Sequence, residues 1–283
     1  MNIDNTIPVF ISFYKTIKQF SLDDLKKFLN DNDAVYQAYF PNHCPRTDER
    51  LQQAVDQYGN KIREIEAFSK QFPEILQAIE RRFQTTYDFD VPLHAKLIVG
   101  TFGSNAFVTS DNKRELYFAA EKLSAKPDHM RVIAAHEIGH VNHFSMATKG
   151  GMDWSKVDWM HGLTTLYTEG AATYFSKQIV PDLKQSMYFS FDDEGDPWVQ
   201  CYEENKEEVK RRFLQDASAG WDMPKEKEWF RLSGGSYFGR NRIGYLLGTD
   251  YIENLVERFG EKKALTFWNG NDLHADAIEW LKA

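Results

Sequence analysis

The chain has 283 residues, of which 42% are hydrophobic and 27% are charged, as is typical of a soluble globular protein with a large core. Its net charge of −8 and the lack of any Lys/Arg-rich block argue against a nucleic-acid partner, and no apolar run is long enough for a membrane span. The two cysteines, Cys44 and Cys201, lie far apart, which favours free thiols in a reducing compartment.

The first residues carry no basic segment followed by an apolar run, so no signal peptide is expected. This favours a cytoplasmic location, with signal-independent export as the alternative. Residues 1–90 are expected to form a helical N-terminal region. Ser21, followed by two acids, is typical of a helix start. Residues 48–69 have apolar positions at helical spacing, and Pro73 is expected to interrupt this helix and begin another.

The pattern changes at Val91 and Pro92, where short β-prone runs begin. Residues 97–102, 105–109 and 115–118 are expected to be strands, with a turn at 111–113. The last two would form a hairpin just before a long helix.

That helix contains the motif His136-Glu137-x-x-His140. Two histidines four residues apart lie on one face of a helix, so both rings can bind one Zn²⁺ ion. Glu137 would project beside the metal and accept a proton from its bound water. Apolar and small neighbours argue against a surface helix with two ordinary histidines.

A catalytic zinc site needs a third protein ligand. Glu169 is the favoured candidate, because Gly170, Ala171 and Ala172 would let its helix approach the metal helix closely. The opposing interpretation is a buried acid paired with an arginine. His143 and His161 are the alternative ligands.

From residue 127 onward the sequence predicts an almost wholly helical chain, with further helices at 158–179, 203–217, 240–259 and 272–282. Arg242 and Tyr245 share a helix face, and Gly244 and Gly248 would let that helix pack closely on the metal helix or leave room for substrate. A tyrosine hydroxyl can donate a hydrogen bond to an oxyanion. Tyr245 is the first candidate for this role, Tyr237 is the second, and Arg242 is a candidate substrate contact.

The His-Glu-x-x-His motif followed by Glu169-Gly170-x-Ala172 resembles the gluzincin clan of zinc peptidases. Together with Arg242-Ile243-Gly244-Tyr245-x-x-Gly248 it is similar to a bacterial family of predicted zinc-dependent proteases. The resemblance implies His136, His140 and Glu169 as ligands, Glu137 as general base and Tyr245 as oxyanion donor. The gap between His140 and Glu169 is longer than in thermolysin-like gluzincins.

A shorter similarity concerns Asn105-Ala106-Phe107, which resembles the substrate-binding edge strand of thermolysin in its distance from the metal helix. An exposed strand edge can pair with the backbone of an extended peptide. Asn105 and Ala106 are therefore expected to bind substrate.

These features predict an α+β, zincin-like fold. A small mixed sheet with an edge hairpin would precede the metal helix (91–147), and a mostly helical lobe (148–283) would complete a metallopeptidase domain at 91–283. The expected function is zinc-dependent peptide hydrolysis, with one Zn²⁺ per chain and a peptide or protein substrate. Three alternatives stay open: a zinc-binding scaffold without turnover, a non-peptide zinc hydrolase, and an exported toxin or effector peptidase.

Overall fold

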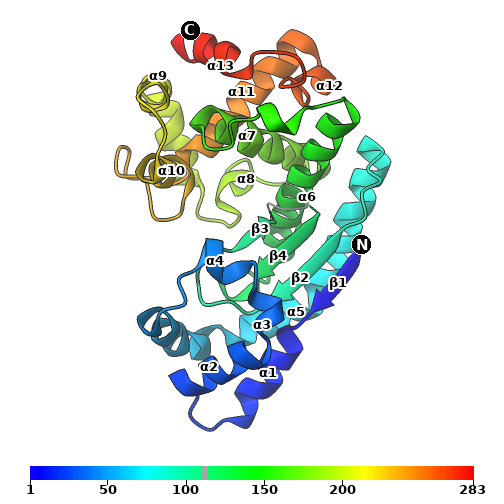
Figure 1. The fold of residues 1–283 in the computed structure, drawn as a ribbon, viewed down its shortest axis with the longest axis vertical. Coiled ribbons are helices and arrows are strands. Elements are labelled where there is room, and N and C mark those ends of the chain that lie inside the picture. The colour runs from blue at the N-terminus through cyan, green and yellow to red at the C-terminus, as the bar shows by residue number, and fades with distance from the viewer. Residues whose placement is uncertain (110–113) are drawn as a thin grey trace. The chain divides into compact units, whose positions relative to one another are not determined.

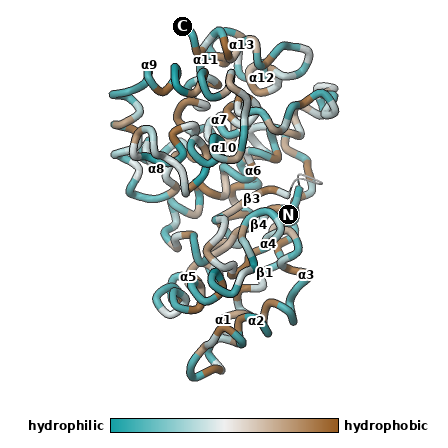
Figure 2. The backbone as a smooth tube through the Cα atoms, turned by 60° about the vertical axis from the view of Figure 1, so that its left-hand side comes forward, coloured by the Kyte–Doolittle hydropathy of each residue, from teal (hydrophilic) through white to brown (hydrophobic). Residues whose placement is uncertain are grey.

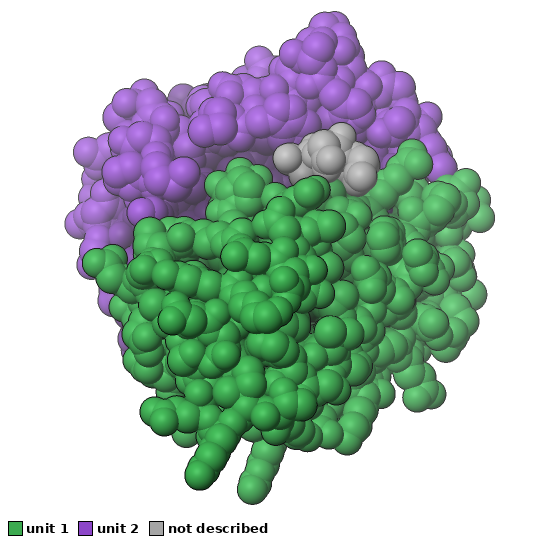
Figure 3. Space-filling model, turned by 60° about the horizontal axis from the view of Figure 1, so that its bottom comes forward, with its two compact units in different colours: residues 1–137 green, residues 138–283 purple. Residues whose placement is uncertain are grey.

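The computed structural model describes residues 1–109 and 114–283. Its contacts divide the chain into two compact units, Met1–Glu137 and Ile138–Ala283, which Figure 3 colours separately. The division falls inside one continuous helix, α6 (Pro127–Lys149). This helix, which carries the His-Glu-x-x-His motif, therefore contributes residues to both units.

Unit 1 is built on a four-stranded sheet with the order β1-β2-β4-β3 (Figure 1). Its strands are β1 (Asn2–Asn5), β2 (His94–Ile98), β3 (Ala106–Val108) and β4 (Glu115–Ala119). The pairs β1·β2 and β2·β4 are parallel, whereas β3 pairs antiparallel with β4. The expected α+β class, with a small mixed sheet and an edge hairpin, is confirmed. The predicted turn at 111–113 lies outside the described residues.

One strand was not predicted, and another was predicted with the wrong end. Residues 1–90 are not wholly helical, because β1 joins the sheet by pairing with a strand far along the chain. The strand predicted at 97–102 ends at Ile98 instead. Beyond it the backbone N–H groups of Gly100 and Phe102 donate to the Glu121 carboxylate, at 2.7 and 3.0 Å. Hydrogen bonds to a side chain thus replace further strand pairing.

The helices of unit 1 begin with α1 (Ile7–Thr16), α2 (Leu22–Asp31), α3 (Asp33–Tyr36) and α4 (Tyr39–His43). Ser21 caps α2 as predicted, since its hydroxyl accepts a hydrogen bond from the Asp24 N–H. The long helix α5 (Asp48–Tyr87) packs on the sheet, where the Phe72 and Phe118 rings lie 4.7 Å apart. A short 3₁₀ turn, η1 (Ala120–Lys122), follows β4.

The predicted break at Pro73 was wrong, because α5 runs through this residue. Proline has no N–H, so the Ser69 carbonyl, four residues earlier, loses its usual helical donor. The Asn5 side chain supplies one instead, with Nδ2 donating to that carbonyl at 3.1 Å. A tertiary hydrogen bond from the end of β1 thus compensates for the proline, which sequence periodicity could not reveal.

Unit 2 is helical beyond α6. Its elements are η2 (Trp154–Lys156), α7 (Gly162–Ile179), α8 (Met187–Ser190), α9 (Asp196–Ser218), α10 (Met223–Phe230), α11 (Ile243–Phe259), α12 (Glu261–Ala264) and α13 (Leu273–Lys282). Hydrophobic and hydrophilic stretches alternate along these helices (Figure 2), as expected for helices with one buried face. No helix of the described residues is both long and apolar enough for a bilayer crossing.

The four helices predicted in unit 2 exist, with shifted starts. The helix expected from 158 begins at Gly162, because His161 is its N-cap. The helix expected from 240 begins at Ile243, because Arg242 has a left-handed backbone with φ 54°. The helix expected at 203–217 is longer, and non-helical angles at Asn205 kink it.

Candidate metal centre

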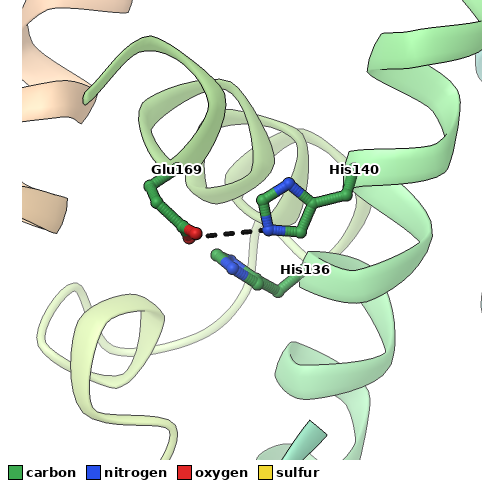
Figure 4. Close-up of side chains that lie close together, drawn as sticks. All are labelled: His136, His140 and Glu169. Atoms are coloured by element: carbon green, nitrogen blue, oxygen red, sulfur yellow. Dashed lines mark ion pairs between the residues drawn. The ribbon is translucent and has the colours of Figure 1, made fainter. Parts of the chain in front are cut away.

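Two imidazoles project from the same side of α6 toward a carboxylate on α7 (Figure 4). His136 and His140 are one turn apart, and Glu169 lies near the middle of α7. One ligand atom from each of the three lies within 4.8 Å of the other two. The Nε2 atom of His140 is 3.5 Å from Oε2 of Glu169. These three residues could therefore hold a metal ion.

The approach of α7 to α6 depends on a glycine of the metal helix itself. A Cβ atom at Gly139 would lie 3.1 Å from the Phe175 Cβ and 3.2 Å from the Ala172 carbonyl oxygen. The backbone of α7 at Ala172 therefore lies directly against Gly139 of the metal helix. Gly170 acts elsewhere, because its own Cβ would lie 2.1 Å from the Gly248 carbonyl oxygen of α11.

The donor set suits zinc. Two neutral imidazoles and one carboxylate are a known ligand set for catalytic Zn²⁺, which leaves a coordination position for water or substrate. His136 and Glu137 are buried, whereas His140 and Glu169 are partly exposed. In residues 1–109 and 114–283, this is the one cluster of three or more such side chains with metal-binding geometry.

The alternative ligands lie outside this group. His143 is fully buried, and its ring stacks on Trp268 with centroids 4.7 Å apart. Burial lowers the pKa of His143 to about 3, so the ring is neutral at physiological pH. His161 caps α7, where its Nδ1 accepts a hydrogen bond from the Leu163 N–H at 3.1 Å. Both rings therefore have roles in packing or capping.

Arg242 lies in an aromatic cage just before α11. Its guanidinium carbon is 4.9 Å from the Trp198 ring centroid, 5.2 Å from Phe191 and 5.6 Å from Tyr245. Its Nη2 donates to the Ser190 carbonyl at 3.2 Å. Burial lowers the pKa of Arg242, whereas the nearby Tyr245, Asp192 and Glu169 favour its charged form. Arg242 and Tyr245 are therefore neighbours, and the electrostatic influence of Glu169 reaches Arg242.

The predicted packing of the two glycines on the metal helix was wrong. A Cβ at Gly248 would meet the Leu166 carbonyl oxygen of α7 at 2.4 Å, and one at Gly244 would meet Phe230 of α10 at 2.5 Å. These glycines place α11 against α7 and α10, so they support the helix that holds Glu169.

Tyr237 belongs to a different cluster. Its exposed ring lies 5.9 Å from that of Trp229, and the guanidinium of Arg212 is 5.0 Å from its centroid. Partial burial, together with the negative charges of Asp216 and Glu228, raises the pKa of this phenol. The second candidate for the oxyanion donor therefore interacts with residues of α9 and α10.

Asn105 directly precedes β3, the edge strand of the unit 1 sheet, and Ala106 is its first residue. The Asn105 carbonyl accepts a hydrogen bond from the Ala119 N–H at 2.8 Å, and its side-chain Oδ1 accepts one from the Ala106 N–H. Among the described strands, β3 pairs with β4 alone. The Ala106 carbonyl accepts a hydrogen bond from the Ser104 hydroxyl at 3.3 Å, so an extended peptide would have to compete with side chains for both backbone groups of Ala106.

Sequence reasoning missed the surroundings of Arg242. Phe191, Asp192 and Trp198 come from the segment around α8 and the start of α9, which carries no recognisable motif. The unusual left-handed backbone of Arg242 was also not foreseeable from residue type.

A comparison with known protein families, curated proteins and solved structures finds no match for this chain. The assignment of function therefore depends on the chemistry of the residues themselves. His136, His140 and Glu169 converge, and Glu137 follows His136 on the same helix.

Proposed function

We propose that this protein is a zinc-dependent peptidase with a zincin-like fold, related to the gluzincin clan. The observation that carries the proposal is the convergence of His136, His140 and Glu169, whose ligand atoms lie within 4.8 Å of one another. Glu137 follows the first of these residues on the same helix. A purely structural zinc site has no need of such an acid beside its ligands.

His136, His140 and Glu169 would hold the metal. Bound zinc would supply Lewis acidity toward a water molecule and toward the carbonyl group of the scissile peptide bond. The carboxylate ligand on α7 contributes one negative charge, and the two imidazoles of α6 contribute none. The metal with its three ligands would thus keep a net positive charge, which suits stabilisation of an anionic transition state.

Glu137 would act as the general base. It would accept a proton as the water oxygen forms its bond to the carbonyl carbon. It would then give that proton to the amide nitrogen as the carbon–nitrogen bond breaks. Glu137 is buried, with 5% of its surface exposed, so little bulk water would compete with this transfer.

Tyr245 would donate a hydrogen bond to the carbonyl oxygen as negative charge develops there. Arg242 would support this role, because its guanidinium lies over the Tyr245 ring and is restrained by two further aromatic rings. A fixed positive charge beside the phenol makes it a better donor. The outer edge of β3, near Asn105 and Ala106, would pair with the substrate backbone.

The test is cleavage profiling of a peptide library by protein loaded with Zn²⁺. We expect cleavage at internal or terminal peptide bonds, loss of cleavage in the presence of a chelator, and recovery after Zn²⁺ is restored. The Glu137→Gln variant, loaded in the same way, serves as the control. Absence of cleavage by the zinc-loaded wild-type protein across the library would contradict the proposal.

A further inference from the structure

Unit 2 contains a cavity of about 750 Å³ that shares no lining residue with the candidate metal centre. Two segments form it: the loop after α6, from Gly150 to Asp158, and the turn before α13 with the first residues of that helix, from Trp268 to His274. A volume of this size is in the usual range for sites that bind small molecules or short peptide segments.

The walls of the cavity are fixed by contacts within unit 2. Asn269 Nδ2 donates to the Ala147 carbonyl at 2.9 Å, and the Trp268 ring stacks on His143. At the other end of the same segment, the His274 ring lies 4.2 Å from that of His161, and its Nε2 is 3.1 Å from the Thr164 hydroxyl. These contacts tie the segment from Trp268 to His274 to α6 and α7, so this wall of the cavity is held in place before a ligand binds.

Two polar atoms of the lining residues are buried without a hydrogen-bond partner in the described part of the chain. They are the indole N–H of Trp268, whose residue is 6% exposed, and the side-chain oxygen of Asn269. A buried polar group that lacks a partner is costly. One is a donor and the other an acceptor, which is the combination that complements an amide group.

The charges of the lining are mainly negative. Asp153, Asp158 and Asp272 contribute three carboxylates, and Lys156 contributes one ammonium group, which lies 3.4 Å from Asp153. Asp158 and Asp272 form no ion pair with any described residue, and both act electrostatically on His274. A cationic group would therefore be attracted to the side of the cavity near His274.

From these observations we propose that this cavity binds a peptide segment with a lysine or arginine side chain. The backbone amide of the segment would pair with the indole N–H of Trp268 and the side-chain oxygen of Asn269 once these two side chains turn toward it, and its cationic group would lie near Asp158 and Asp272. This inference is independent of the proposed hydrolysis, because binding here needs neither the metal nor Glu137.

Isothermal titration calorimetry on the full chain tests the proposal, with acetyl-Lys-Lys-amide as the probe. The matched peptides are acetyl-Glu-Glu-amide and acetyl-norleucyl-norleucine-amide, which reverse or remove the charge. We expect the lysine peptide to bind most tightly and to weaken as salt is added. Equal affinity for all three peptides, or no binding of the lysine peptide up to about 10 mM, would overturn the proposal.

Variants locate the binding. Asp158→Asn and Asp272→Asn each remove a negative charge. Each asparagine keeps a side-chain oxygen that can accept the existing hydrogen bond, from the Met160 N–H at position 158 and from the Ala275 N–H at position 272. Each should raise the Kd of the lysine peptide about two- to fivefold, as for exposed ion pairs. Trp268→Phe, which keeps a ring but removes the N–H, should raise it about two- to tenfold.

The matched control is Asp222→Asn. Asp222 is an exposed aspartate that caps α10 in the same manner, by accepting from the Lys225 N–H, and it does not line the cavity. Its variant should bind the lysine peptide as the wild type does. An unchanged Kd in the double variant of Asp158 and Asp272 would show that the peptide binds elsewhere and would overturn the proposal.

Discussion

The Nε2 atom of His140 lies 3.5 Å from Oε2 of Glu169, although the two residues belong to different helices separated by a long connection. The approach depends on Gly139, whose missing side chain leaves room for the backbone of Ala172 on α7. The residue beside the second histidine therefore positions the helix that carries the carboxylate. The geometry of the candidate metal centre is thus a consequence of helix packing as well as of the His-Glu-x-x-His spacing.

Glu169→Ala should lose most of its zinc. The purified wild-type protein should hold about one zinc per chain, and two imidazoles alone bind the metal poorly. Elemental analysis after dialysis measures the occupancy. Glu253→Ala, which removes an exposed carboxylate of α11 that pairs with Lys177, is the control and should keep its zinc. Full occupancy in Glu169→Ala would exclude Glu169 as a ligand.

Gly170→Ala should destabilise unit 2, because the added Cβ would meet the backbone carbonyl of Gly248 at 2.1 Å. Neither helix backbone can move away without losing its packing, so the free energy of unfolding should fall by about 3 kcal/mol. Denaturant unfolding measures it.

Gly59→Ala is the matched control for that variant. Gly59 is an exposed glycine inside α5, and its added Cβ would have only an ordinary contact, 3.6 Å from the Tyr14 hydroxyl. Alanine in a helix is more favourable than glycine, so this variant should gain about 0.5–1 kcal/mol. If both variants were equally stable, the close α7–α11 contact would be refuted.

Tyr245→Phe should lower kcat by roughly 100-fold with little change in KM, because the hydrogen bond to the oxyanion forms mainly in the transition state. Steady-state kinetics on a cleaved library peptide measures both constants. Tyr237→Phe is the control, because Tyr237 contacts Trp229 and Arg212 instead. A normal kcat in Tyr245→Phe, with a reduced one in Tyr237→Phe, would transfer the role to Tyr237.

Glu121 should make the stability of the fold depend on pH. It is 1% exposed, and burial raises its pKa from 4.5 to about 7. The folded protein therefore holds this proton to a higher pH than the unfolded chain. The stabilising contribution is complete below pH 4.5 and is lost as the pH rises through 7, by up to about 3 kcal/mol.

Urea unfolding at several pH values between 4.5 and 8 measures this contribution, with Glu121→Gln as the comparison. The variant loses one acceptor for the Gly100 or Phe102 N–H and should be less stable than the wild type at low pH. Its free energy of unfolding should change less with pH over this range. The same pH dependence in both proteins would contradict the raised pKa.

The features that could be predicted from the sequence depend on residues that are close together in the chain. The shared face of His136 and His140 follows from helix geometry, and the β3–β4 hairpin follows from two adjacent β-prone runs. Glu169 could be found because a carboxylate buried among small residues of an apolar helix is costly unless it is paired with a charge or binds a metal. These predictions needed no knowledge of distant contacts.

The features that could not be predicted depend on residues far apart in the chain. Residues 2–5 form the strand β1 because they pair with β2. Helix α5 continues through Pro73 because the Asn5 side chain donates a hydrogen bond to the Ser69 carbonyl. Arg242 was expected on a helix face, whereas it lies before the helix among aromatic rings from another segment. Tertiary contacts override local propensity in each case.

The most direct test of the proposed function is the rate of peptide cleavage by Glu137→Gln with its zinc content measured in the same sample. Glu137 is not one of the three residues that could hold the metal. The variant should therefore fold, keep the zinc content of the wild type and lose activity by about 10²- to 10⁴-fold, the usual contribution of a general base. Wild-type activity in a zinc-loaded Glu137→Gln protein would contradict the proposed mechanism.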